Sequence, residues 1–253
     1  HQPIHNEDRT IWGVLNGEIY NFQELKKDLQ ARGHVFDTNS DTEVLVHLYE
    51  EAGTACVTRL NGMFAFALWD RQERSLVLGR DRAGEKPLYY GWQGDSLLFG
   101  SELKALTAHP SFNANIDRNA LTLLLRHNCI PAPYSVYKDI RKLPPGHLLK
   151  YSSDDLAAKR QPAPSAYWRI NDVVEDGIAN PFSGSERDAI DATERQLLQS
   201  VGAQMLSDVP LGAFLSGGVD SSAIAALMQA QSNQPVKTFT VGFDDAQYDE
   251  AAD

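Results

Sequence analysis

The sequence has few cysteines, no long apolar run and no concentrated positive charge, and each absence excludes a class of protein. Its two cysteines, Cys56 and Cys129, lie far apart without a C-x-x-C pair, so we expect both to be small buried side chains in a reducing cytoplasm. The longest unbroken apolar run, 63–69, is much shorter than the ~20 residues that span a bilayer. The seven histidines are scattered without metal-ligand spacing, and we expect no structural zinc site.

The charge balance is acidic. The chain has 34 acidic and 23 basic residues, a formal net charge of −11, and no block rich in lysine or arginine. Partners such as nucleic acid or a membrane surface are therefore disfavoured. With 253 residues the length allows about one and a half to two domains. No methionine or strand pattern precedes Ile11, and the sequence stops where a helix begins, so we expect an excerpt of a longer protein, cut at both ends.

The hydrophobic periodicity predicts two architectures. The first part has a strand at 11–15, helices at 22–32, 41–53 and 117–127, and short strands of an antiparallel sheet at 63–70, 75–80, 88–92 and 97–99. Residues 152–187 contain prolines and serines with little periodicity, which indicates a linker. The last part has a helix at 186–206, a strand at 211–215, a helix to 231 and a strand at 236–242. This order is typical of a parallel sheet with helical crossovers.

A glycine-containing loop, Ser216–Ser222, connects that strand to the following helix. Gly217 and Gly218 let the backbone approach a ligand closely, and the helix N-terminus attracts anions. The hydroxyls of Ser216, Ser221 and Ser222 add donors, whereas Asp220 fits beside phosphate if it holds Mg²⁺. Neither a Walker-type nor a dinucleotide motif is present. The alternative is a glycine turn with a serine cap on a core helix, which the surrounding strand, helix and acidic residue disfavour.

This loop and its flanks, 207–215 and 238–243, resemble the synthetase domain of glutamine-hydrolysing asparagine synthetases, within the ATP pyrophosphatase superfamily. The resemblance implies ATP and Mg²⁺ as cofactors, with diphosphate bound by the loop and Mg²⁺ held by Asp220 through the phosphates. It also places Leu215 and Val241 along the adenine or ribose, although both can equally be strand core residues.

A second motif, Asn16-Gly17-Glu18, follows the first predicted strand. Attack on a carboxamide creates an oxyanion, and an asparagine amide with a glycine N–H is a suitable pair of donors for it. The alternative is that Asn-Gly forms a hairpin turn.

The segments 40–43, 60–70, 80–90 and 101–106 resemble, in this order, the class II glutamine amidotransferase domain of the same family, over nearly all of 1–151. The resemblance implies that Asn16 and Gly17 form an oxyanion hole and that Glu18 and Asp41 help to hold glutamine. For Asp41 the alternative is a helix N-cap. We interpret Arg80, Asp81, Arg82 and Lys86 as a structural ion-pair cluster between sheet and loop.

The family's nucleophile is a cysteine at the mature N-terminus, whose own α-amino group acts as the base. The first residue here is His1, and Cys56 and Cys129 cannot substitute because their amines lie in peptide bonds. We therefore expect the nucleophile, with a glutamine-binding arginine, upstream of His1, and further strands of the synthetase domain beyond Asp253.

The implied fold is an α+β N-terminal-nucleophile hydrolase sandwich (αββα) over 1–151. A linker at 152–187 leads to the first part of an α/β adenine-nucleotide hydrolase-like parallel-sheet domain over 188–253. The implied reaction converts aspartate, glutamine and ATP to asparagine, glutamate, AMP and diphosphate through a β-aspartyl-adenylate in the cytoplasm. Two alternatives stay open: a related amidotransferase or β-lactam-forming synthetase with another carboxylate, or a non-catalytic family member. The sequence leaves open which residues form the acceptor pocket and whether the protein forms a homodimer.

Overall fold

The computed structural model describes residues 1–207 and 209–242 and divides the chain into two compact units, His1–Glu175 and Asp176–Asp253. Among the described helices, none combines the length and apolar character that a membrane crossing needs.

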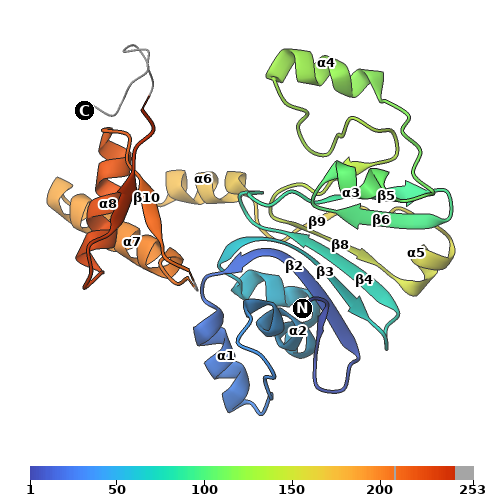
Figure 1. Ribbon diagram of the computed structural model, residues 1–253, viewed down its shortest axis with the longest axis horizontal. Helices are drawn as coiled ribbons and strands as arrows, with labels where there is room; N and C mark the ends of the chain where they lie inside the picture. Colours follow the sequence, from blue (N-terminus) through green and yellow to red (C-terminus); the bar gives the residue numbers. More distant parts are fainter. Residues whose placement is uncertain (208, 243–253) are drawn as a thin grey trace. The chain divides into compact units, whose positions relative to one another are not determined.

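The first unit is built on a six-stranded antiparallel sheet in the order β1-β2-β3-β4-β8-β9 (Figure 1). Its strands are β1 (Ile4–His5), β2 (Ile11–Ile19), β3 (Gly62–Asp70), β4 (Ser75–Arg80), β8 (His147–Tyr151) and β9 (Ser165–Ala166). β2 pairs with β3 along its whole length, from Ile11 opposite Asp70 to Ile19 opposite Gly62. The strand predicted to end before Asn16 therefore continues through Gly17, and the hairpin alternative for Asn-Gly is wrong.

Side chains of β3 alternate between two apolar cores, as expected of a strand buried on both faces. Phe64 and Phe66 pack with two helices, α1 (Phe22–Ala31) and α2 (Asp41–Ala52), whereas Ala65 and Ala67 face a second sheet. The short helix η1 (Gly53–Arg59) follows α2. Residues 42–49 of α2 are all buried, so this helix forms the centre of its layer.

The second sheet has three antiparallel strands in the order β6-β5-β7. They are β5 (Tyr89–Gln93), β6 (Ser96–Gly100) and β7 (Arg141–Lys142). The short strands predicted as one sheet are thus divided between two, with Tyr90, Leu143 and Tyr151 buried between them. Helices α3 (Leu103–Thr107) and α4 (Arg118–His127) lie toward the second sheet, whereas α1 and α2 lie against the first (Figure 1).

Part of the stretch 152–187 belongs to the first unit. Helix α5 (Ser153–Ala157) is followed by β9, which pairs with β8, and the Tyr167 hydroxyl donates to the Arg80 carbonyl at 2.8 Å. Helix α6 (Ile170–Ala179), which the sequence did not predict, crosses the boundary between the units. The division of the chain at 151 and 187 stays a prediction.

The second unit begins with α7 (Glu186–Gln204), which has a capping box formed by Ser185 and Asp188. Strand β10 (Gly212–Phe214), helix α8 (Val219–Ala230) and strand β11 (Lys237–Phe239) follow. β10 and β11 pair in parallel, as the strand–loop–helix–strand pattern predicted.

Candidate functional site

The Asn16 side chain is exposed on β2 and is oriented by the other sheet. Its Nδ2 donates to Ser101 Oγ at 2.8 Å, immediately after β6. One amide hydrogen is therefore engaged, and the amide has a second hydrogen with which to donate to a ligand.

Gly17 is required by a close approach between strands. Its φ is +139°, and a Cβ there would lie 2.0 Å from the Met63 carbonyl oxygen and 2.8 Å from Phe64 Cα. The same crowding occurs at Gly62, where a Cβ would lie 2.1 Å from the Glu18 carbonyl oxygen. Two glycines thus shape the backbone beside the predicted oxyanion donors.

The side chain of Asp41, the first residue of α2, lies against the last residue of β2, Ile19. Its Oδ2 accepts from the Ile19 N–H at 2.9 Å, and the N-cap of α2 is Ser40, whose hydroxyl accepts from the Thr42 N–H. The N-cap alternative for Asp41 is therefore wrong. Glu18 is exposed one residue before Ile19, so two carboxylates flank this strand end and would favour an ammonium group.

Tyr20, the residue after β2, also lies near carboxylates. Burial, with the carboxylates of Glu85 and Glu18 nearby, raises the pKa of the Tyr20 hydroxyl. The structure therefore brings Asn16, Gly17, Glu18 and Asp41 to one end of β2, in acidic surroundings.

The Arg80–Lys86 segment is structural, but not through the ion pairs expected. Arg80 donates to the carbonyls of Lys86, Leu143 and Gly84 at 2.7, 2.8 and 2.6 Å, and burial lowers its pKa. Arg82 donates to the Leu60 carbonyl at 2.9 Å. Within the described ranges, Arg80, Asp81, Arg82 and Lys86 form no ion pair with one another. Each arginine donates to backbone carbonyls instead.

The segment Ser216–Ser222 is predominantly exposed, and its residues from Val219 onward form the first turn of α8. Gly217 has φ +72°, which glycine adopts without strain. Gly218 is the N-cap, and no side chain in the described part of the chain caps the helix. The Ser221 hydroxyl lies 3.1 Å from that of Ser216 and donates to the Gly218 carbonyl at 3.2 Å.

This donor set fits a phosphate chain, since helix N–H groups and serine hydroxyls surround an accessible turn. Asp220 is exposed in the first helical turn, where a carboxylate can hold a cation. The Leu215 N–H donates to the Phe239 carbonyl at 2.8 Å. Val241 is 57% exposed beyond β11, so it is not a core residue of the described structure.

The cysteines differ from each other. Cys56 is buried, and burial raises the pKa of its thiol to about 12, which makes it a poor nucleophile. Cys129 is exposed, so the expectation that both are buried is wrong for this residue.

The sequence analysis did not identify a cluster of Glu7, His34, His47 and Glu50, whose ligand atoms all lie within 4.8 Å of one another. These residues come from three segments, and the sequence carries a signal only for His47 and Glu50, which are three residues apart and so share one face of α2. The contact between Ser101 and Asn16 was also not predicted, although Ser101 lies in a segment that carries the resemblance.

Comparisons with known proteins identify both parts of the chain. Residues 1–168 match the family model for a glutamine amidotransferase domain, and residues 192–253 match the model for asparagine synthase. Asparagine synthetase (glutamine-hydrolyzing) 3 of Bacillus subtilis is 40% identical over 242 residues, covering 92% of this chain and 36% of that protein. A putative asparagine synthetase 2 of Methanocaldococcus jannaschii is 38% identical over 267 residues, covering 99% of this chain and 49% of that protein.

The first and larger part of the chain is thus a class II glutamine amidotransferase domain. With the asparagine synthase segment that follows it, the chain belongs to the asparagine synthetase family. It spans about a third to a half of the length of these two relatives.

Proposed function

We propose that the protein transfers nitrogen from glutamine to a carboxylate that ATP has activated, with aspartate as the acceptor. The products are asparagine, glutamate, AMP and diphosphate, by way of a β-aspartyl-adenylate. The observation that carries the proposal is the accessible Ser216–Ser222 loop between parallel strands, in the same chain as an amidotransferase domain. The names of the relatives, which are glutamine-hydrolysing asparagine synthetases, support the choice of acceptor.

In the glutamine site, the Asn16 amide and the Gly17 N–H would donate to the oxyanion that forms on the substrate carboxamide. Ser101 orients the Asn16 amide beforehand, which limits the reorganisation needed during the reaction. Asp41 would pair with the α-ammonium of glutamine, and Glu18 would help to hold the substrate. The nucleophile would be a cysteine with a free α-amino group, which neither Cys56 nor Cys129 provides. These roles suit an N-terminal-nucleophile hydrolase sandwich.

In the synthetase part, Ser216, Gly217, Gly218, Ser221 and Ser222 would bind the diphosphate portion of ATP through N–H and hydroxyl groups. Asp220 would hold Mg²⁺, which neutralises phosphate charge when bound. Leu215 and Val241 would lie along the nucleoside. ATP is needed because a carboxylate is a poor electrophile, and conversion to an acyl-adenylate supplies AMP as a leaving group. This arrangement suits an α/β adenine-nucleotide hydrolase-like domain.

The test is ATP–pyrophosphate exchange by the full-length protein across a panel of carboxylic acids. We expect exchange that depends on aspartate. Exchange with a different acid would replace aspartate as the acceptor but keep the chemistry. If no acid supports exchange while glutamine is still hydrolysed, the synthetase proposal is wrong.

A further inference from the structure

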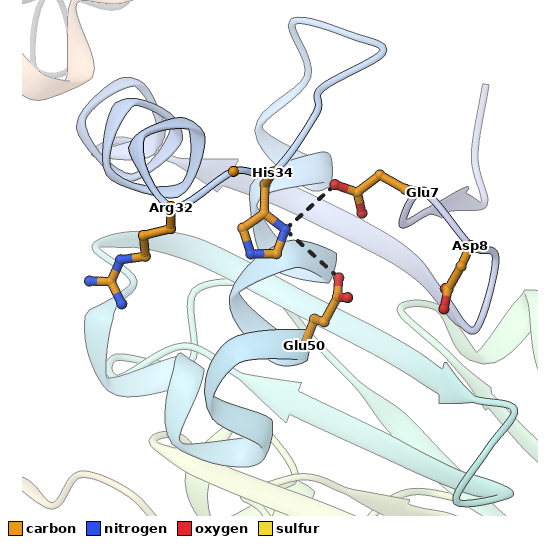
Figure 2. Close-up of a pocket in the computed structure, with 6 residues that line it drawn as sticks. Glu7, Asp8, Arg32, His34 and Glu50 are labelled. Carbon is orange, nitrogen blue, oxygen red and sulfur yellow. Dashed lines mark ion pairs between the residues drawn. The ribbon is translucent and has the colours of Figure 1, made fainter.

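Two histidines and two glutamates converge in the first unit, among residues that the proposed reaction does not use. Glu7 lies between β1 and β2, His34 follows α1, and His47 and Glu50 belong to α2. Figure 2 shows Glu7, His34 and Glu50 pointing toward one another from these separate segments. The four residues each offer one ligand atom, and these atoms all lie within 4.8 Å of one another.

The separations suit ligands of one ion better than partners in hydrogen bonds. His34 Nδ1 lies 3.6 Å from Glu7 Oε1 and 3.8 Å from Glu50 Oε2. His47 Nδ1 lies 3.4 Å from Glu7 Oε2 and 3.9 Å from Glu50 Oε2. Hydrogen bonds from nitrogen to oxygen usually span about 2.7–3.2 Å. Four ligands at about 2.1 Å around a tetrahedral ion lie about 3.4 Å apart, so atoms that now lie within 4.8 Å of one another would have to approach by up to about 1.4 Å.

His47 supplies an independent indication of a ligand. The residue is 1% exposed, and neither of its ring nitrogens has a hydrogen-bond partner among the described residues. A buried polar atom without a partner is costly. Its Nδ1 is directed at the carboxylates of Glu7 and Glu50.

The surroundings of His34 also resemble those of a metal ligand. While its Nδ1 faces the cluster, its Nε2 lies 3.0 Å from Glu51 Oε1. Metal-bound histidines commonly use the second ring nitrogen in this way, since the carboxylate fixes the tautomer and the ring orientation. Arg32 donates to Glu51 at 3.2 Å and so holds this carboxylate in place.

The two carboxylates of the cluster are oriented as well. Glu7 Oε1 accepts from the Val35 N–H at 2.8 Å, and Glu50 Oε2 accepts from Asn6 Nδ2 at 3.2 Å. Two carboxylates beside two imidazoles form a mixed oxygen and nitrogen set, which suits Zn²⁺ and similar ions. An adjoining pocket of about 320 Å³, lined by Glu7, Asp8, Arg32, Gly33, His34 and Glu50, gives an ion a way in (Figure 2).

We propose that Glu7, His34, His47 and Glu50 bind one divalent transition-metal ion, Zn²⁺, which fastens the β1–β2 connection and the segment after α1 to α2. None of these four residues is among those proposed to bind glutamine or nucleotide. The metal ion would stabilise the fold and take no part in the reaction.

The test is metal titration of the full chain after treatment with a chelator. We expect one equivalent of Co²⁺ to bind with the visible absorption of a tetrahedral site, Zn²⁺ to displace it, and either metal to raise the Tm. His34→Gln and Glu50→Gln should each weaken Zn²⁺ binding by about 10-fold or more, and Glu51→Gln by about 10-fold through the orientation of His34.

The matched controls are His127→Gln and Glu24→Gln, which change exposed residues outside the cluster and should leave the affinity unchanged. Because His47 is buried and its replacement can disturb folding, the test depends on His34 and Glu50. Both variants are first compared with the parent by circular dichroism without metal. A parent chain that binds no Co²⁺ or Zn²⁺, or equal affinity in His34→Gln, Glu50→Gln and the controls, would show an ionic cluster without a metal and overturn the proposal.

Discussion

Replacement of Gly17 by alanine tests whether the glycine at the proposed oxyanion site is required by the contact between β2 and β3. The residue has φ +139°, and a Cβ would lie 2.0 Å from the Met63 carbonyl oxygen. That oxygen belongs to the backbone of β3, which is packed between two layers and cannot rotate away as a side chain can. We therefore expect Gly17→Ala to force the two strands apart.

The expected loss has two parts. Holding a non-glycine residue in this backbone conformation costs about 1–3 kcal/mol. Relieving the overlap with β3 costs about 1–3 kcal/mol more, as in other overpacked sites. The total of about 2–6 kcal/mol is a large fraction of the stability of a typical domain. Gly33 provides the matched control because it has φ +104° but no atom within 4 Å of the Cβ position. Gly33→Ala should show only the first part.

The assay is urea unfolding of both variants, followed by tryptophan fluorescence. All four tryptophans, at positions 12, 69, 92 and 168, lie in the first unit, so the signal reports that unit. Gly17→Ala should be less stable than Gly33→Ala by about 1–3 kcal/mol, since only the former meets the neighbouring strand. Equal losses, or a greater loss for Gly33→Ala, would refute the reasoning.

Three further predictions concern single side chains. In the full-length protein, Asn16→Ala should lower glutamine-dependent synthesis by about 10²-fold and spare ammonia-dependent synthesis; equal losses with both nitrogen sources would contradict an oxyanion role. Asp220→Ala should abolish ATP-dependent product formation with either nitrogen source while glutamine hydrolysis continues, with exposed Glu194→Ala as the control; loss of hydrolysis as well would make Asp220 structural. A thiol reagent at pH 8 should modify exposed Cys129 and leave Cys56 unmodified, because burial raises the Cys56 pKa to about 12. Mass spectrometry would locate the label. Rapid modification of Cys56 in the folded chain would be inconsistent with its burial.

Local patterns predicted the elements well where one face or both faces of an element carry a regular apolar series. The strand predicted at 63–70 is observed at Gly62–Asp70, and the helix predicted at 186–206 is observed at Glu186–Gln204. Helix α6 was missed although Ile170, Val173, Val174 and Ile178 have helical spacing, since the prolines around them favoured a linker. These apolar side chains are exposed, so burial in a core does not explain the helix either.

Short-range signals were ambiguous where contacts between distant segments decide the conformation. Asn16-Gly17 is a strong hairpin signal, but the pair lies inside a strand because the backbone of residues 63 and 64 approaches it closely. Ser40, and not Asp41, caps α2, and this leaves Asp41 Oδ2 for the Ile19 N–H. The cluster of Glu7, His34, His47 and Glu50 could not be predicted, since only the fold of the chain brings Glu7 and His34 to α2.

Asp81 shows how a structural residue can determine the geometry of the proposed glutamine site. It is 1% exposed, and its Oδ2 accepts from the N–H groups of Phe64 and Lys86 at 3.2 and 3.0 Å. Phe64 lies directly opposite Gly17 in the register of β2 and β3. Asp81 therefore fixes the β3 backbone at the level of the proposed oxyanion donors. Since donors of this kind act only when they are positioned beforehand, we expect the segment after β4 to contribute to the proposed site by holding the backbone of β3.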